Sequence, residues 1–71
     1  MLFGQALSKV MDEKGVDAVT LSRLSGVTTP YISKIRKGEI VDPTFTKAIA
    51  LITALGMTPN EFVNTIYEDE S

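Results

Sequence analysis

The stretch 18–38, AVTLSRLSGVTTPYISKIRKG, decides the fold. Its apolar spacing predicts two short helices that flank a tight turn at Gly26. Ser22 supplies a small side chain, which lets the two helices cross closely. We expect the apolar residues of the stretch to face inward: Leu21, Leu24, Val27, Ile32 and Ile35. The second helix then directs outward Thr29, Pro30, Tyr31, Ser33 and Lys34.

Positive charge gathers in the same stretch. It contains four cations and no carboxylate: Arg23, Lys34, Arg36 and Lys37. The whole chain has a formal net charge of −2, but three of its nine acidic residues lie at positions 68–70. Residues 1–67 therefore carry seven cations against the remaining six anions, a balance of +1. An acid-free segment exposed on a short helix favours a polyanionic partner.

Length and composition exclude several classes of protein. The 71 residues suffice for one small domain. The chain has no cysteine for disulfides or thiolate metal sites, and no histidine, the commonest general base. We find no nucleophile–base pair, metal-binding cluster or phosphate loop, so we expect neither enzyme activity nor a cofactor. No apolar run approaches the roughly 18 residues of a membrane span, and no signal peptide is visible, so we expect a cytoplasmic location.

Helix signals also surround the central stretch. A first helix is predicted over about 2–14, with inward residues Phe3, Leu7, Val10 and Met11. Gly15 ends it in a left-handed conformation, and Asp17 caps the next helix. The start of the third helix is open. Thr28 as the cap places Thr29 in the helix just before Pro30, which is disfavoured, whereas Thr29 as the cap removes that conflict. The helix then runs through 31–37 and ends at Gly38.

Two more helices complete the predicted fold. Residues 39–43 form a loop, Thr44 caps a helix over 45–55, and Gly56 ends it. Its predicted buried stripe is Phe45, Ala48, Leu51, Ile52 and Leu55. Thr58, Pro59 and Glu61 form a capping box that opens the last helix. We therefore predict a compact all-α domain of five helices over 1–67 and an acidic disordered tail over 68–71.

Several landmarks together resemble the helix-turn-helix of the phage repressor and Cro family of DNA-binding proteins. They are 21–28 (LSRLSGVT), then Ile32-Ser33-Lys34-Ile35 and Gly38. Phe3-Gly4 with Leu7 and Val10 resembles the first helix of that family, and Pro43-Thr44-Phe45 and 54–58 (ALGMT) resemble its fourth helix and the turn that follows. The resemblance implies a lambda-repressor-like fold with the helix-turn-helix at helices two and three. It also implies a sequence-specific regulator, a repressor that binds a palindromic operator as a dimer.

The same resemblance assigns roles to residues of the third helix, which enters the major groove in such proteins. It places Thr29, Pro30 and Lys34 at base-facing positions, with Thr28, Tyr31 and Ser33 close by. Lys34 could bond guanine O6 or N7, and Thr29 a base or a thymine methyl group. The plainer interpretation of Lys34 is a solvated surface lysine. Phosphate contacts are expected from Lys37 and from the amide groups that follow Thr44, at Phe45 and beyond.

Three features depart from the family pattern. Ala18 stands where relatives often have a glutamine that bonds a phosphate, so that contact is lost. Met11 and Arg36 stand where relatives often pair an arginine with a glutamate. Arg36 is then either a free phosphate ligand or a partner of Glu39 or Asp12. Asp42 lies in a loop that is often basic in relatives, and it would repel phosphate.

Dimerisation is the other implied requirement, because relatives read two half-sites. The candidate interface residues are Met57, Val63 and Tyr67, while Ile66 fits the monomer core at least as well. Ile40 and Val41 are further apolar candidates. With no second domain, we expect no small-molecule ligand, and no membrane partner. The alternative function is a helical adaptor or antitoxin-type protein that uses the same fold to bind protein.

Overall fold

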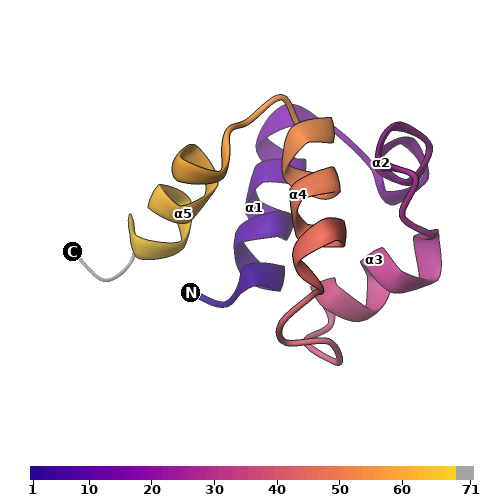
Figure 1. Cartoon of the computed structure of the whole chain (residues 1–71), viewed down its shortest axis with the longest axis horizontal. Coiled ribbons are helices and arrows are strands. Elements are labelled where there is room, and N and C mark those ends of the chain that lie inside the picture. Colours follow the sequence, from indigo (N-terminus) through magenta and orange to yellow (C-terminus); the bar gives the residue numbers. More distant parts are fainter. Residues whose placement is uncertain (69–71) are drawn as a thin grey trace.

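Five helices follow one another along residues 1–68, the part of the chain that the computed structural model describes (Figure 1). They are α1 (Phe3–Lys14), α2 (Ala18–Ser25), α3 (Thr29–Arg36), α4 (Phe45–Ala54) and α5 (Pro59–Tyr67). Those residues contain no strand. The predicted all-α, five-helix class is confirmed.

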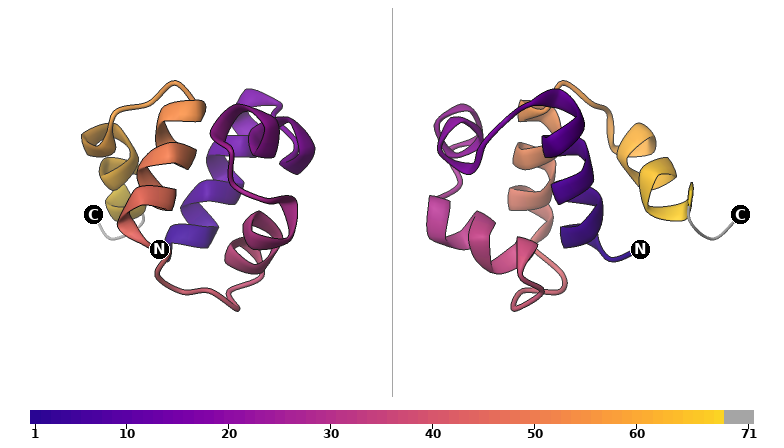
Figure 2. Two further views of the ribbon diagram at one scale, coloured as in Figure 1. Left: turned by 45° about the vertical axis from the view of Figure 1, so that its right-hand side comes forward. Right: turned by 180° about the vertical axis from the view of Figure 1, so that it is seen from behind.

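The helices are arranged around a central pair, α1 and α4. Helices α2 and α3 lie on one side of this pair and α5 lies on the other, in all three views (Figures 1 and 2). Helix α1 contacts α3 and α5, helix α4 contacts α2 and α5, and α2 contacts α3. The longest dimension of the molecule is 33 Å. Helices α3 and α5 therefore occupy opposite ends of the domain.

Local capping explains where α2 begins and ends. The Asp17 carboxylate accepts a hydrogen bond of 2.8 Å from the backbone N–H of Thr20. This bond occupies one of the amide groups that a helix leaves unpaired at its start. Gly15 and Gly26 end α1 and α2 with φ of 65° and 78°, a backbone conformation that favours glycine. These predicted boundaries are confirmed.

Thr28 is the cap of α3. Its hydroxyl accepts a hydrogen bond of 3.3 Å from the Tyr31 N–H, and Thr29 and Pro30 are the first two residues of the helix. Proline at the second position of a helix costs no hydrogen bond, because the first four backbone N–H groups of a helix have no partner within it. Helix α3 ends at Arg36, one residue before the predicted end, and Lys37 is its C-cap.

The hydrophobic core draws on every helix. Its fully buried large side chains are Leu7, Met11, Leu21, Ile32, Ile35, Leu51 and Phe62. Phe3 packs against Phe62, with ring centroids 4.8 Å apart, and so joins α1 to α5. No side-chain nitrogen or oxygen buried among residues 1–68 lacks a hydrogen-bond partner.

The prediction that Leu24 faces inward is wrong. Its side chain is 58% exposed, because the buried face of α2 centres on Leu21 and continues through the half-buried Ala18, Ser22 and Ser25. Those residues follow the i, i+3, i+4, i+7 spacing of one helix face. Leu24 lies on the other flank of Leu21, beyond that face.

The prediction that Phe45 belongs to the buried stripe of α4 is also wrong, because this residue is 80% exposed. It is the first residue of α4, and side chains on a helix lean toward the N-terminus. The ring therefore extends past the end of the helix, away from the core that Leu51, Ile52 and Leu55 form farther along.

The predicted capping box opens α5. The Thr58 N–H donates to Glu61 Oε1 at 2.8 Å, and the Glu61 N–H donates to the Thr58 hydroxyl at 3.2 Å.

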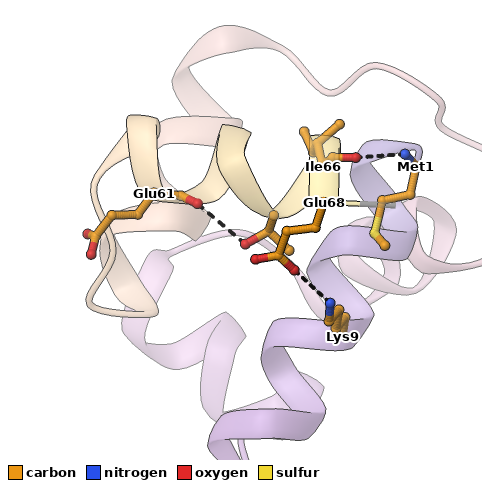
Figure 3. A network of polar contacts seen from close by, with 6 residues as sticks. Met1, Lys9, Glu61, Ile66 and Glu68 are labelled. Carbon is orange, nitrogen blue, oxygen red and sulfur yellow. Dashed lines mark hydrogen bonds and ion pairs between the residues drawn. The ribbon is translucent and has the colours of Figure 1, made fainter. Parts of the chain in front are cut away.

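Polar contacts at the other end of α5 hold it against the start of the chain and α1. Figure 3 shows them: Lys9 Nζ lies 2.9 Å from Glu68 Oε2, and the Met1 amino group donates to the Ile66 carbonyl oxygen at 2.8 Å. Glu68, the first residue of the predicted acidic tail, is the C-cap of α5. The rest of that predicted tail, 69–71, lies outside the described residues.

Gly4 brings α1 against α3. It is buried, and a Cβ atom at this position would lie 2.0 Å from the carbonyl oxygen of Ile35. Only a residue without a side chain permits that approach. Gly4 therefore sets how closely the start of α1 meets the end of α3.

Replacing Gly4 with alanine tests this contact. In a helix the exchange ordinarily stabilises a protein by roughly 0.5–1 kcal/mol. Here we expect Gly4→Ala to lower the free energy of unfolding by about 1–3 kcal/mol, because the new methyl group must displace the Ile35 backbone. Urea unfolding followed by circular dichroism measures the change. An unchanged or raised stability would show that α1 and α3 are not locked at this point.

The caps of α2 and α5 also predict a dependence of stability on pH. The Thr20 backbone N–H bonded to Asp17 holds the pKa of that carboxyl below its usual value, and the Thr58 backbone N–H does the same for the pKa of Glu61. A carboxyl whose pKa is lower in the folded state stabilises the fold at pH values above its unfolded-chain pKa, about 3.9 for Asp. This stabilisation is lost as the pH falls through the lower pKa of the folded state. We expect Asp17→Asn, which keeps a capping residue, to lose less stability than the wild type between pH 7 and pH 3.

Urea titrations at several pH values measure this difference. Glu13→Gln is the matched control, because it removes an exposed carboxylate that caps no helix. A pH dependence in Asp17→Asn equal to that of the wild type would contradict the role given to the Asp17 charge.

Candidate functional site

The exposed surface of α3 divides into two stripes. Pro30 and Lys34 are exposed and four residues apart, so they form one ridge. Thr29 and Ser33, also four apart, are half-buried and face a hollow beside the helix. Ile32 and Ile35 fill the opposite face and are fully buried, which fixes the rotation of α3 about its axis. Of the predicted base-facing residues, Pro30 and Lys34 thus lie on the ridge and Thr29 lies at its flank.

Tyr31 connects α3 to the start of α4. Its hydroxyl accepts a hydrogen bond of 3.3 Å from the Thr44 N–H. Lys47 Nζ lies over the aromatic ring, 4.2 Å from its centroid, in a cation–π contact. Tyr31 therefore holds a cation and the beginning of α4 beside the ridge of α3.

The start of α4 is open to an acceptor from outside. Thr44 is the N-cap, as predicted, but its side chain makes no capping hydrogen bond. Its own N–H is taken by Tyr31, and the amide groups that follow, from Phe45 onward, point out of the helix end. Because the N-terminal end of a helix carries partial positive charge, this end and the Lys47 ammonium together favour an anion.

A hollow of about 410 Å³ lies on the other flank of α3, toward α1 and α2. Its lining residues are Ser8, Ala18, Thr29, Ser33, Arg36 and Lys37. Arg36 Nε donates a hydrogen bond of 3.1 Å to the Ser8 hydroxyl. Within residues 1–68 Arg36 makes no ion pair with either of the partners considered from the sequence, Asp12 and Glu39.

Charge around α3 is predominantly positive. Lys34, Arg36, Lys37 and Lys47 are all exposed on α3 or next to it. Two carboxylates, Glu39 and Asp42, are exposed in the loop between α3 and α4. The positive surface is therefore a band along α3 that reaches to α4, with an acidic loop at its border.

Of the residues predicted for an interface between subunits, those of α5 lie on the side of the molecule opposite α3 (Figure 1). On α5, Val63 is 42% and Tyr67 57% exposed, and the two are four residues apart on one stripe. Met57 and Ile66 are half-buried and pack against the core, as does Ile40. Val41, the remaining candidate, lies with Leu2 in a separate hollow of about 200 Å³ between the start of α1 and the loop after α3.

Two contributors to the site were missed by the sequence analysis. Lys47 was not connected with Tyr31, and Ser8 was not considered as a partner of Arg36. The only signal for Ser8 is its spacing of four residues from Gly4, which places both on the face of α1 that meets α3. Nothing in the spacing of Tyr31 and Lys47 indicates their contact, because they lie on different helices.

Other kinds of site are not seen in the described part of the chain. No group of three or more histidine, cysteine or acidic residues there could hold a metal ion. None of the helices within residues 1–68 is long and apolar enough to span a membrane.

A comparison with known protein families finds a match over most of the chain. Residues 6–68 match the model of the Cro/C1-type HTH DNA-binding domain, and this range includes all of α2, α3, α4 and α5. No curated protein and no solved structure matches the chain.

Proposed function

This chain belongs to the Cro/C1-type family of helix-turn-helix DNA-binding domains, a non-enzymatic family, and from that membership we propose that it is a transcriptional repressor that reads its operator with α3. The observation that carries the proposal is the ridge of Pro30 and Lys34 on a helix whose opposite face is locked in the core. In the helix-turn-helix geometry the second helix of the pair lies in the major groove, and its N-terminal residues meet base edges.

We assign base reading to the first turns of α3. Lys34 is exposed and can donate to guanine O6 and N7, whereas Pro30 has no side-chain donor and can only contact a thymine methyl group or another apolar edge. Thr29 lies at the flank of the ridge and brings a hydroxyl and a methyl group. The Thr28 hydroxyl oxygen accepts from the Tyr31 N–H, and its O–H remains able to donate to a nearby phosphate.

Backbone phosphates are assigned to the two borders of α3. On the side of α4, the amide groups from Phe45 onward and Lys47, placed by Tyr31, provide donors and positive charge. Phe45 itself is available for apolar contact with a deoxyribose. On the other side, Lys37 follows the end of α3 and is exposed. These contacts position the protein without reading sequence.

We further propose that the working form is a twofold dimer joined through α5. Val63 and Tyr67 form an exposed apolar stripe on a helix that contacts only α1 and α4. Half-sites in operators lie one helical turn apart, about 34–36 Å. An interface at α5 leaves both copies of α3 free to enter the DNA, because α3 and α5 lie on opposite sides of the domain (Figure 1). Such a dimer would repress by occupying the operator and excluding polymerase, and its DNA partner fits a cytoplasmic location.

The two lysines of α3 test the assignment of base and phosphate contacts. On a duplex obtained by selection from random DNA, we expect a Kd on the order of 10⁻⁸ M. Lys34→Ala should cost about 1–3 kcal/mol of binding on that duplex and relax the preference at one base pair. Lys37→Ala should weaken binding to all sequences and lower the salt slope by about one phosphate contact. Fluorescence anisotropy at several salt concentrations measures both quantities.

Two results would contradict these assignments. If both variants lose affinity equally on every duplex, Lys34 is a phosphate ligand and base reading lies elsewhere. If the wild type binds no selected duplex and shows no salt dependence, the protein is not a DNA regulator, and the adaptor or antitoxin-type function takes precedence.

A charge placed on α5 tests the dimer. Val63 is exposed, so we expect Val63→Glu to leave the circular dichroism spectrum and the melting temperature nearly unchanged while abolishing cooperative binding to a two-half-site operator. Binding to a single half-site should remain. Val63→Ile is the control, because it keeps the apolar stripe and should bind like the wild type. If Val63→Glu unfolds the domain, Val63 belongs to the core, and the interface is to be sought at Val41.

A further inference from the structure

The hollow between α3 and the helices α1 and α2 is lined in a way that suits a tetrahedral oxyanion. Arg36 and Lys37 bring two cations, and Ser8, Thr29 and Ser33 bring three hydroxyl groups. No carboxylate lines it. Ala18 contributes only a methyl group, and at the start of α2 the Asp17 carboxylate takes the Thr20 N–H. The side-chain donors of the hollow are therefore the two cations and the three hydroxyl groups.

Ser8 gives Arg36 a defined direction. The hydrogen bond of 3.1 Å occupies the Nε–H of the guanidinium group. A guanidinium has five N–H donors in a planar fork, so the four on its two Nη atoms remain to bind an anion in the bidentate manner typical of phosphate. Arg36 is exposed, and its Ser8 partner is half-buried on α1. Ser8 thus restricts a side chain that would otherwise move freely in solvent.

We propose that this hollow is a binding site for one backbone phosphate of the DNA in each half-site, with Arg36 as the ligand and Ser8 as its positioning residue. The inference rests on the proposed function, because α3 in the major groove brings a flanking strand past the hollow. Lys37 stands at the same rim and adds positive charge. Thr29 and Ser33 provide further hydroxyl donors from the flank of the α3 ridge.

A chemical substitution in the DNA identifies the contact. Methylphosphonate replaces one charged phosphate by a neutral group, and it can be introduced at each position of the selected duplex in turn. The wild type should be sensitive at every phosphate it contacts, including those assigned to Lys37 and to the start of α4. At the position assigned to Arg36 we expect the replacement to lower affinity about tenfold near 0.1 M salt, the size of one lost counterion contact. Arg36→Met should bind the unmodified duplex about tenfold more weakly and be insensitive to the replacement at that position.

Two further variants complete the design. Lys14→Met removes a cation at the far end of α1 and serves as the matched control, so it should keep the full sensitivity to methylphosphonate. Ser8→Ala keeps the Arg36 charge and should lower affinity several-fold with an unchanged salt slope. In the Arg36→Met background Ser8→Ala should have no further effect, because Ser8 acts through Arg36. Circular dichroism and urea unfolding check that every variant folds.

The outcomes separate this site from the function on which it rests. If Arg36→Met is as sensitive to methylphosphonate as the wild type at every position, the hollow binds no phosphate, and the DNA-binding proposal stands without it. If Ser8→Ala weakens binding equally with and without Arg36, Ser8 does not position Arg36. If the wild type binds no duplex at all, the proposed function fails, and the site fails with it.

Discussion

The contact on which the reading surface depends is the one between Gly4 and the carbonyl oxygen of Ile35. It lets the backbone at the start of α1 approach the backbone at the end of α3 more closely than any side chain would allow. On the same face of α1, Ser8 lies one turn farther on and bonds Arg36, and Met11 follows in the core. Two successive turns of α1 thus fix the position of α3, through backbone contact at Gly4 and a hydrogen bond from Arg36 to Ser8.

Tertiary packing matters more here than helix propensity, because α2 and α3 have eight residues each. Helices of that length are not stable alone in water. Caps at Asp17 and Thr28 define their first residues, and Leu21, Ile32 and Ile35 bury their inner faces. The outer face of α3 is then free to carry residues that contribute little to stability, which is the condition for a surface that binds a partner.

Much of the architecture could be predicted because its signals are local. Gly15, Gly26, Asp17 and the Thr58–Glu61 capping box each act within one turn of the chain, and each lies where the pattern indicated. The five-helix fold followed from such local signals, and the family from the order of the segments 21–28, 32–35 and 54–58. The choice between Thr28 and Thr29 as the cap of α3 could not be made from propensities. The steric penalty on a helical residue before proline is local, and the packing of the whole helix can outweigh it.

The errors concern relations between helices. Leu24 and Phe45 each fit the apolar spacing of their own helix. The helices packed against α2 decide which of its faces is buried, and the start of α4 leaves Phe45 beyond the core. The contacts of Arg36 with Ser8 and of Lys47 with Tyr31 each join two different helices, so no spacing within one helix indicates them. The roles given to individual site residues in binding DNA stay predictions, because they depend on a molecule that is not part of the fold.

The separation of α3 from α5 has a consequence for how such a domain can change. The two helices share no direct contact, and α1 and α4 lie between them. Energetic effects of substitutions at distant sites without shared partners are close to additive. The outward residues of either helix can therefore be exchanged without retuning the other. Under the proposed roles, one scaffold could acquire a new operator while keeping its subunit partner, or a new partner while keeping its operator.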